Sequence, residues 1–190
     1  MSSPTQTDLS GCTIAFLAVD GFEQAELEQP FNALLAAGAV PKIISQKTGQ
    51  IQGFHHDVKA GVFNVDETFA NCQPGQFDAV VLPGGVMNAD QIRMDPDAQR
   101  LVKEFDAAGK PVAVICHGAW LLISSGLTIG RTLTSWPSLE DDLRNAGAHW
   151  VDKEVVTDRN WISSRKPADI PAFISAFIGA IAVMHAVPSH

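Results

Sequence analysis

The sequence is poor in the residues that several classes of protein require. Only 3 of its 190 residues are cysteine, an odd number spread along the chain, which argues against a disulfide framework and favours a reducing cytoplasm. No C-x-x-C or H-x-x-x-H pair occurs, so no metal site is predicted. Basic residues number 13 against 21 acidic ones. The resulting net charge of -8 argues against nucleic acid or an anionic membrane as a partner.

Other missing features argue against nucleotide binding, a signal peptide and a membrane span. Neither G-x-G-x-x-G nor G-x-x-x-x-G-K-[ST] is present, so nucleotide binding has no support and no cofactor is expected. Residues 1–10 are polar, lack the apolar core of a signal peptide and are predicted to be a disordered tail. Residues 170–187 carry no formal charge but only just reach the length of a membrane span. We interpret them as a terminal helix that packs on a sheet or at a subunit interface.

The remaining residues, 11–187, predict a single α/β domain. Apolar runs that read as buried strands alternate with segments that begin and end like helices. This alternation is typical of a doubly wound, mostly parallel sheet with helices on both faces. Strands are expected near residues 13–19, 41–45, 77–82, 111–115, 132–135, 149–151, 155–156 and 161–163, and helices near 23–37, 95–108, 119–125, 137–146 and 170–187.

Cys116 follows the strand at 111–115 and precedes a predicted helix, which places its thiol at the carboxyl edge of the sheet. The N–H groups and partial positive charge of a helix N-terminus lower the pKa of a thiol. Gly118 leaves space for a substrate carbonyl to approach the backbone. The pattern is that of a nucleophile elbow with Cys in place of Ser. The alternative is that Cys116 is a small buried residue that ends a core strand.

Acidic residues after the first strand are candidates for activating this thiol. Glu26 or Glu23 would reach it if their strand ends nearby. A carboxylic acid that is buried near an anion stays protonated and donates a hydrogen bond to it. The alternative is that both residues simply favour the first turn of a helix.

The turn Pro83-Gly84-Gly85 follows another predicted strand, and its glycines leave N–H groups free for an oxyanion. Further along this loop, Asp90 would orient His117 as the third member of a triad, or would be a solvated loop acid. Trp136, after a later strand, either forms a wall of the site or belongs to the core. The adjacent His55 and His56 point in opposite directions if extended, so they are not expected to share a metal.

Three segments together resemble the ThiJ/PfpI superfamily, and most closely its PfpI-type branch. They are Ala113-Val-Ile-Cys-His-Gly118, Leu82-Pro-Gly-Gly85 and Phe22-Glu-Gln-Ala-Glu26, and the resemblance runs from about Thr13 to Phe177. It implies a flavodoxin-like α/β sandwich whose cysteine elbow is similar to that of class I glutamine amidotransferases. It also implies a homo-oligomer, either a dimer or a hexamer.

The resemblance assigns roles to individual residues. Cys116 matches the nucleophile, Glu26 the acid that hydrogen-bonds its thiol, and His117 the histidine that follows it. Asp90 matches a carboxylate that meets this histidine from a neighbouring subunit.

The resemblance also outlines the surroundings of the thiol. The backbone N–H groups of Gly85 and His117 match the anion hole. Glu23, Gly84, Gly118 and Trp136 complete the expected pocket.

The function implied is that of a cysteine-dependent, stress-protective enzyme acting on reactive carbonyls or glycated groups, as a cofactor-free glyoxalase or deglycase. The alternatives are an intracellular cysteine peptidase and a non-catalytic redox sensor or chaperone. A glutamine amidotransferase is not favoured, because none of the six histidines has Glu two residues later. The expected partners are a small carbonyl compound or peptide and other copies of the chain.

Overall fold

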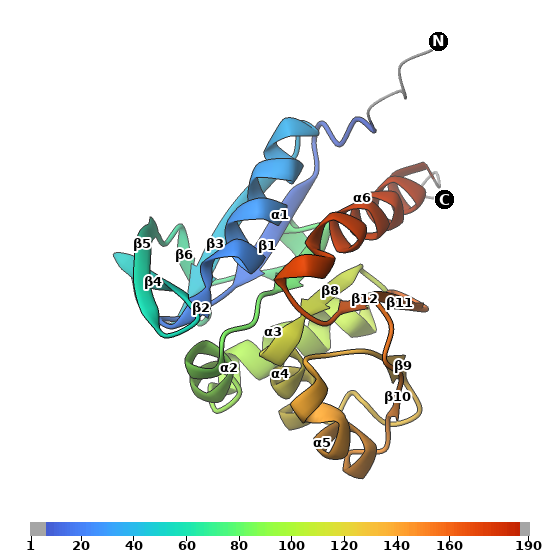
Figure 1. The fold of residues 1–190 in the computed structure, drawn as a ribbon. Coiled ribbons are helices and arrows are strands. Elements are labelled where there is room, and N and C mark those ends of the chain that lie inside the picture. Colours follow the sequence, from blue (N-terminus) through green and yellow to red (C-terminus); the bar gives the residue numbers. More distant parts are fainter. Residues whose placement is uncertain (1–6, 187–190) are drawn as a thin grey trace.

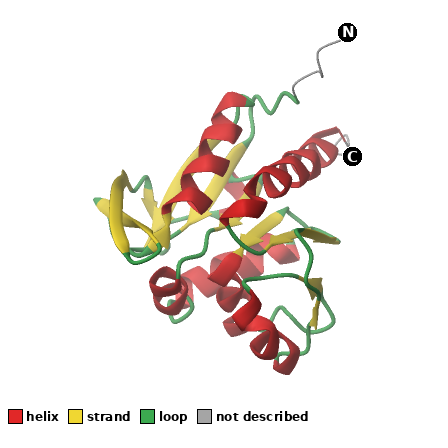
Figure 2. Ribbon diagram, in the orientation of Figure 1, coloured by secondary structure: helices red, strands yellow, loops and turns green. Residues whose placement is uncertain are grey.

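The computed structural model describes residues 7–186 and has a seven-stranded sheet at its centre (Figures 1 and 2). All neighbouring strands are parallel except the antiparallel β11–β12 pair, which confirms the predicted sheet. In spatial order the strands are β11 (Val155–Asp158), β12 (Trp161–Ser164), β8 (Val112–Ile115), β7 (Ala79–Leu82), β1 (Thr13–Leu17), β3 (Val40–Ser45) and β6 (Glu67–Thr68).

Helices cover both faces of this sheet, as expected for a flavodoxin-like sandwich. On one face α1 (Gln24–Ala36) and α6 (Ile170–Ala186) lie side by side (Figure 1). On the other face are α3 (Pro96–Ala107) and α4 (Ala119–Ser124). The remaining elements are α2 (Val86–Ile92), α5 (Glu140–Asn145), the small sheet of β2 (Phe22–Glu23), β4 (Gln50–His55) and β5 (Val58–Asn64), and the pair β9 (Thr132–Leu133) and β10 (His149–Trp150).

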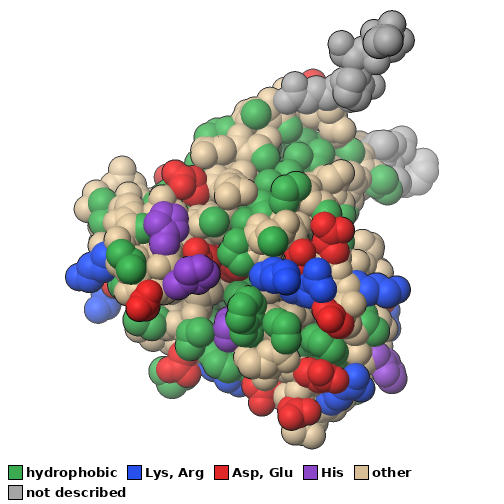
Figure 3. Space-filling model, viewed as in Figure 1, with side chains coloured by type: hydrophobic (Ala, Val, Ile, Leu, Met, Phe, Trp, Pro, Cys, Tyr) green, Lys and Arg blue, Asp and Glu red, His purple; other side chains and the backbone are tan. Residues whose placement is uncertain are grey.

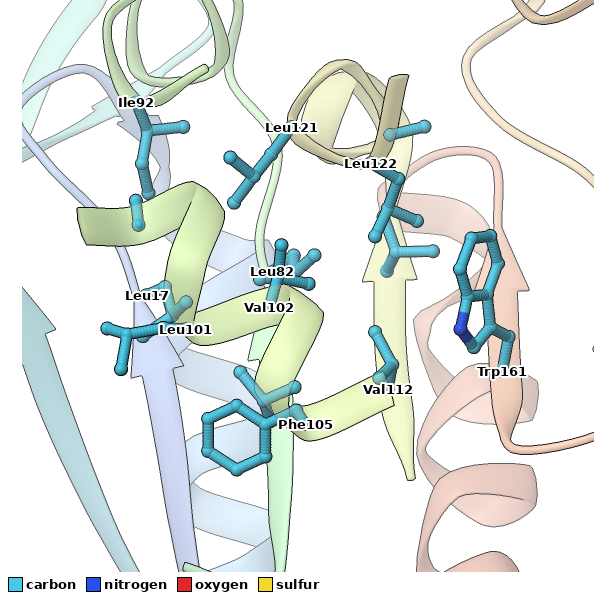
Figure 4. Packing of buried hydrophobic residues seen from close by; sticks show 14 of the residues in the cluster. Leu17, Leu82, Ile92, Leu101, Val102, Phe105, Val112, Leu121, Leu122 and Trp161 are labelled. Carbon is cyan, nitrogen blue, oxygen red and sulfur yellow. The ribbon is translucent and has the colours of Figure 1, made fainter. Parts of the chain in front are cut away.

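The central strands read as continuous apolar runs because both of their faces are buried. In β8, Val112 and Val114 belong to the core on the α3 side, whereas Ala113 and Ile115 belong to the core on the α6 side. Figure 4 shows the first of these cores. Its labelled side chains include Leu101, Val102 and Phe105 of α3, together with Leu82 of β7 and Val112.

The segment Pro167–His185, which includes most of α6, is long and apolar enough to cross a membrane by length and composition alone. Its mean hydropathy is 1.7. In the structure Phe173, Phe177 and Ile181 are buried in the core on this side of the sheet. The expected helix packed on the sheet is therefore confirmed, although its predicted end at Val187 lies outside the described residues.

Two sequence predictions need correction. Residues 1–6 of the expected tail lie outside the described residues, but Leu9 is buried and its N–H donates to the Ala37 carbonyl at 2.7 Å, so the packed domain begins before residue 11. Residues 86–92, interpreted as loop, form α2. That helix has no capping side chain and follows Gly85 at a φ of 88°, so the usual start signals are missing.

Phe105 offers a test of this core. Its side chain is fully buried between α3 and the sheet, and Phe105→Ala should lower the free energy of unfolding by about 3–5 kcal/mol because it leaves a cavity. Urea denaturation measures the change. Lys103→Ala, at an exposed position of the same helix, is the control and should shift the midpoint little. Equal effects of the two substitutions would contradict this packing.

Candidate active site

Cys116 lies on a strained turn between β8 and α4. Its φ is 62°, in the left-handed region that non-glycine residues rarely occupy, and its side chain is only 7% exposed. Such a conformation costs about 1–3 kcal/mol and is found mainly at functional sites. The turn is the predicted nucleophile elbow, and it favours the functional interpretation of Cys116 over that of a core residue.

Two glycines near Cys116, Gly84 and Gly118, allow neighbouring segments of the chain to pack closely against one another. A Cβ on Gly118 would lie 2.5 Å from the Leu82 carbonyl oxygen, so this glycine lets the elbow pack against the end of β7. The expectation that Gly118 makes room for substrate is wrong for this reason. A Cβ on Gly84 would lie 2.6 Å from the Cys116 Cβ and would also collide with Glu26. Both glycines are buried and neither lines the cavity at the site.

Glu26, in the first turn of α1, is fully buried beside the thiol. Its Oε2 accepts a hydrogen bond of 2.8 Å from the Gly84 N–H. Burial raises the pKa of Glu26 to about 8 and the charge of Glu23 acts in the same direction, although hydrogen bonds with Gly84 and Cys116 oppose the shift. Glu26 is therefore protonated at neutral pH and has a proton to donate.

The pKa of the Cys116 thiol differs from the prediction. Burial raises the pKa of Cys116, and a charge on Glu26 would raise it further, whereas the N–H groups of His117 and Gly85 act in the opposite direction. The lowered pKa predicted from the helix N-terminus is wrong, because the burial of the thiol outweighs the effect of the N–H groups that lie close to it. A thiol with a raised pKa acts as a nucleophile only after a base has taken its proton.

The imidazole of His117 lies within reach of this thiol and can accept a proton. Its Nδ1 lies 3.2 Å from the Cys116 Sγ, and burial lowers the pKa of the imidazole, which keeps it neutral and able to accept a proton. The ring stacks on Trp136 at a centroid distance of 5.9 Å and meets the edge of Trp120 at 5.3 Å. Two tryptophans therefore orient the imidazole within one chain. The role of Trp120 could have been inferred from its position three residues after His117 at the start of a helix.

Asp90 does not orient His117 within the chain. It is exposed on α2 and forms none of the hydrogen bonds or ion pairs found among residues 7–186. The helix that replaces the expected loop carries Asp90 to the surface. Its predicted contact with the histidine of a neighbouring subunit stays a prediction.

A cavity of about 370 Å³ opens above the thiol. Its lining includes the predicted Glu23, Glu26, Gly85, Cys116, His117 and Trp136, and adds Gly21, His56, Asp57, Val86, Met87 and Pro167. The lining is mainly apolar, with acids and imidazoles at the base and rim. This cavity suits a small, largely uncharged compound such as a carbonyl.

The rim of the cavity contains an unexpected cluster around Glu23. The Nδ1 atoms of His55 and His56 each lie 3.8 Å from one of its carboxylate oxygens, and the His56 N–H donates to Oε2 at 3.0 Å. The two imidazoles were expected to point apart, but His56 has a φ of 57° at the β4–β5 turn, so the strand has already ended. Figure 3 shows histidine side chains gathered over this hairpin, on the face that Figure 1 presents.

The fold and this site define an α/β protein with a cysteine elbow, and the comparisons agree. The model of the DJ-1/PfpI family matches residues 12–180. The chain belongs to the DJ-1/PfpI family.

Two relatives match this chain over most of their own length. Deglycase PH1704 of Pyrococcus horikoshii is 43% identical over 166 residues, which cover 87% of this chain and 96% of the relative. The putative cysteine protease YraA of Bacillus subtilis is 36% identical over 160 residues, covering 84% and 92%.

A crystal structure supports the same fold. The two-domain protein with DJ-1/ThiJ/PfpI-like and ferritin-like domains from Anabaena variabilis superimposes with a TM-score of 0.85 at 32% identity. The match covers 94% of this chain and 50% of that one.

The raised pKa of Glu26 predicts a pH dependence of stability. Between about pH 4.5 and 8 the folded chain holds a proton that the unfolded chain has lost, so stability falls as pH rises through this window. Glu26→Gln cannot ionise and should remove this loss, which is on the order of 5 kcal/mol at most. Urea denaturation of both proteins at pH 5 and pH 8.5 measures it. Parallel changes in the two proteins would show that Glu26 is not protonated in the folded state.

Proposed function

We propose that this protein is a cysteine-dependent, stress-protective enzyme of the glyoxalase or deglycase type, acting on reactive carbonyls or glycated groups. The observation that carries the proposal is the Cys116 thiol, held on its strained turn between a protonated acid and a neutral imidazole beneath a small cavity. The deglycase name of the Pyrococcus relative supports this chemistry. We place the protein in the cytoplasm, where a free reactive thiol stays reduced.

The reaction begins with addition of sulfur to a carbonyl. As the Cys116 sulfur bonds to the carbonyl carbon, its proton moves to Nδ1 of His117. The oxygen takes up the electron pair, and we assign its stabilisation to the N–H groups of Gly85 and His117, which lie close to the Cys116 sulfur. His117 then gives its proton to this oxygen, which produces a hemithioacetal and leaves the imidazole neutral again.

With a 2-oxoaldehyde the hemithioacetal rearranges within the site. Neutral His117 takes the proton from the carbon that carries sulfur and returns it to the adjacent carbon, while the hydroxyl proton of the first carbon passes to the oxygen of the second; the product is a thioester of a 2-hydroxy acid. Water then hydrolyses the thioester and restores the thiol. In an early glycation adduct, which is an aldehyde joined to an amine, the C–N bond would break as the carbon bonds to sulfur, and the leaving amine would take the thiol proton from His117.

Cys116→Ala tests this role. Conversion of methylglyoxal to lactate should fall by at least about a thousandfold, as expected for loss of a nucleophile. Cys72→Ala is the matched control, because Cys72 is also buried but lies outside the cavity, and it should keep the activity.

The same pair of variants separates the alternatives. A peptidase, which the name of the Bacillus relative suggests, would cleave a model peptide in a Cys116-dependent way without forming lactate. A redox sensor would do neither but would accumulate Cys116 sulfinate with peroxide. Either result, with no Cys116-dependent lactate, would contradict the proposal.

We also propose that the site is completed in a homo-oligomer, whose simplest unit is a two-fold dimer. Exposed apolar side chains lie on and just after α2, with Val86 54%, Met87 43% and Met94 70% exposed, and Asp90 lies among them. A second copy covering this surface would bring Asp90 of the partner subunit towards His117. His117 Nε2 is available for it, since no hydrogen bond to this atom is found within the described part of the chain.

Mixed dimers test the shared site. Cys116→Ala and Asp90→Ala homodimers should each be nearly inactive. Refolding equal amounts together makes half of the dimers mixed, and each mixed dimer has one intact site, so activity should return to roughly a quarter of wild type. No recovery in a preparation shown to contain mixed dimers would mean that Asp90 does not act across the interface.

A further inference from the structure

A second group of reactive side chains lies at the opposite edge of the central sheet. Cys12 directly precedes β1 and Asp78 directly precedes β7, and these strands are parallel neighbours. Two hydrogen bonds hold their starts together: the Thr13 N–H donates to Asp78 Oδ2 at 2.7 Å, and the Asp78 N–H donates to the Thr13 carbonyl at 2.8 Å. The third member is His185, in the last turn of α6.

The donor atoms of these residues converge. His185 Nε2 lies 3.4 Å from Asp78 Oδ1, and one sulfur, one oxygen and one nitrogen atom from the three side chains all lie within 4.8 Å of one another. In a tetrahedral zinc site, bond lengths of about 2.0–2.3 Å place neighbouring donors roughly 3.3–3.8 Å apart. The donor atoms of His185 and Asp78 already have this separation, and the Cys12 sulfur lies no more than 4.8 Å from either of them.

The thiol of Cys12 indicates that the cluster is more than a surface ion pair. Cys12 is 1% exposed, and its sulfur takes part in none of the hydrogen bonds found across residues 7–186. A cation between the three side chains would bind the thiolate, and the thiol proton would be released to solvent.

We propose that Cys12, Asp78 and His185 bind a Zn²⁺ ion, with the fourth position open to water. Thiolate, imidazole and carboxylate are the ligands that Zn²⁺ takes in proteins. The C-terminal end of α6 carries partial negative charge, which also favours a cation there. His185 is 42% exposed in its side chain, so an ion reaches the site from solvent.

The ion would connect the last turn of α6 to the starts of β1 and β7. The site is distinct from the cavity at Cys116, because β1 and β7 run from one to the other and the length of a strand, roughly 15 Å, separates the two edges. Its effect is therefore expected on the stability of α6 and on the reactivity of Cys12, rather than on the chemistry at Cys116.

Cobalt titration of the full chain tests the proposal, since Co²⁺ replaces Zn²⁺ and reports a bound thiolate by a charge-transfer band in the near ultraviolet. The titration uses Cys116→Ser protein, which removes the thiol of the active site as a competing ligand. One Co²⁺ per chain should bind, with the charge-transfer band and the visible bands of a tetrahedral site. Zn²⁺ should displace it and raise the melting temperature.

Variants in the same background decide which residues bind the ion. Cys12→Ala should abolish the charge-transfer band, and His185→Gln should weaken binding by at least about tenfold. Cys72→Ala and His149→Gln are matched controls, a buried cysteine and an exposed histidine outside the cluster, and should bind like the parent. If Cys12→Ala does not fold, His185→Gln decides alone, because the exposed side chain is dispensable for packing.

The proposal is overturned if Co²⁺ produces no charge-transfer band in the parent. It is also overturned if the band and the affinity are the same in His185→Gln as in His149→Gln.

Discussion

The structure of the site depends on one buried proton, that of Glu26. A carboxyl group with no exposure and one N–H donor, from Gly84, is more stable neutral than charged at neutral pH. The neutral acid then lies against the Cys116 thiol without repelling negative charge that develops on sulfur. A permanent charge at this position would oppose every step in which the sulfur gains electron density. The burial that raises the pKa of Glu26 is thus also what makes it compatible with a nucleophile.

This burial is possible because three elements approach one another unusually closely. The start of α1, the turn after β7 and the elbow after β8 meet where Gly84 and Gly118 lack side chains, and a methyl group at either position would collide with its neighbours. The strain at Cys116 persists because the flanking elements are fixed by the two cores of the sheet. Reactivity at the site is therefore supported by packing far from the thiol.

The features that the sequence predicted are those with short-range signals. Strands buried on both faces read as apolar runs, and Glu26, Gly85 and Cys116 follow such runs, so parallel strand order brings them to one edge. The properties that the sequence did not predict depend on contacts between segments that are far apart in the chain. The pKa of Cys116 depends on how completely the site excludes water, and the approach of His55 and His56 to Glu23 depends on a single left-handed residue in a hairpin. Residues 8–10 were predicted to belong to a tail, because nothing in the local sequence indicates that Leu9 contacts Ala37.

The two edges of the sheet show how neighbours determine what a cysteine does. At the carboxyl edge the sulfur of Cys116 faces N–H groups, a neutral acid and a neutral imidazole, an environment that accepts negative charge transiently and leaves the sulfur free to attack carbon. At the amino edge the sulfur of Cys12 faces the carboxylate of Asp78 and the imidazole of His185, which suit a cation. The polarity of parallel strands contributes to this difference, because their carboxyl ends lead into turns with free N–H groups, whereas Asp78 precedes the amino end of β7. The same residue type is therefore suited to covalent chemistry at one end of the sheet and to metal binding at the other.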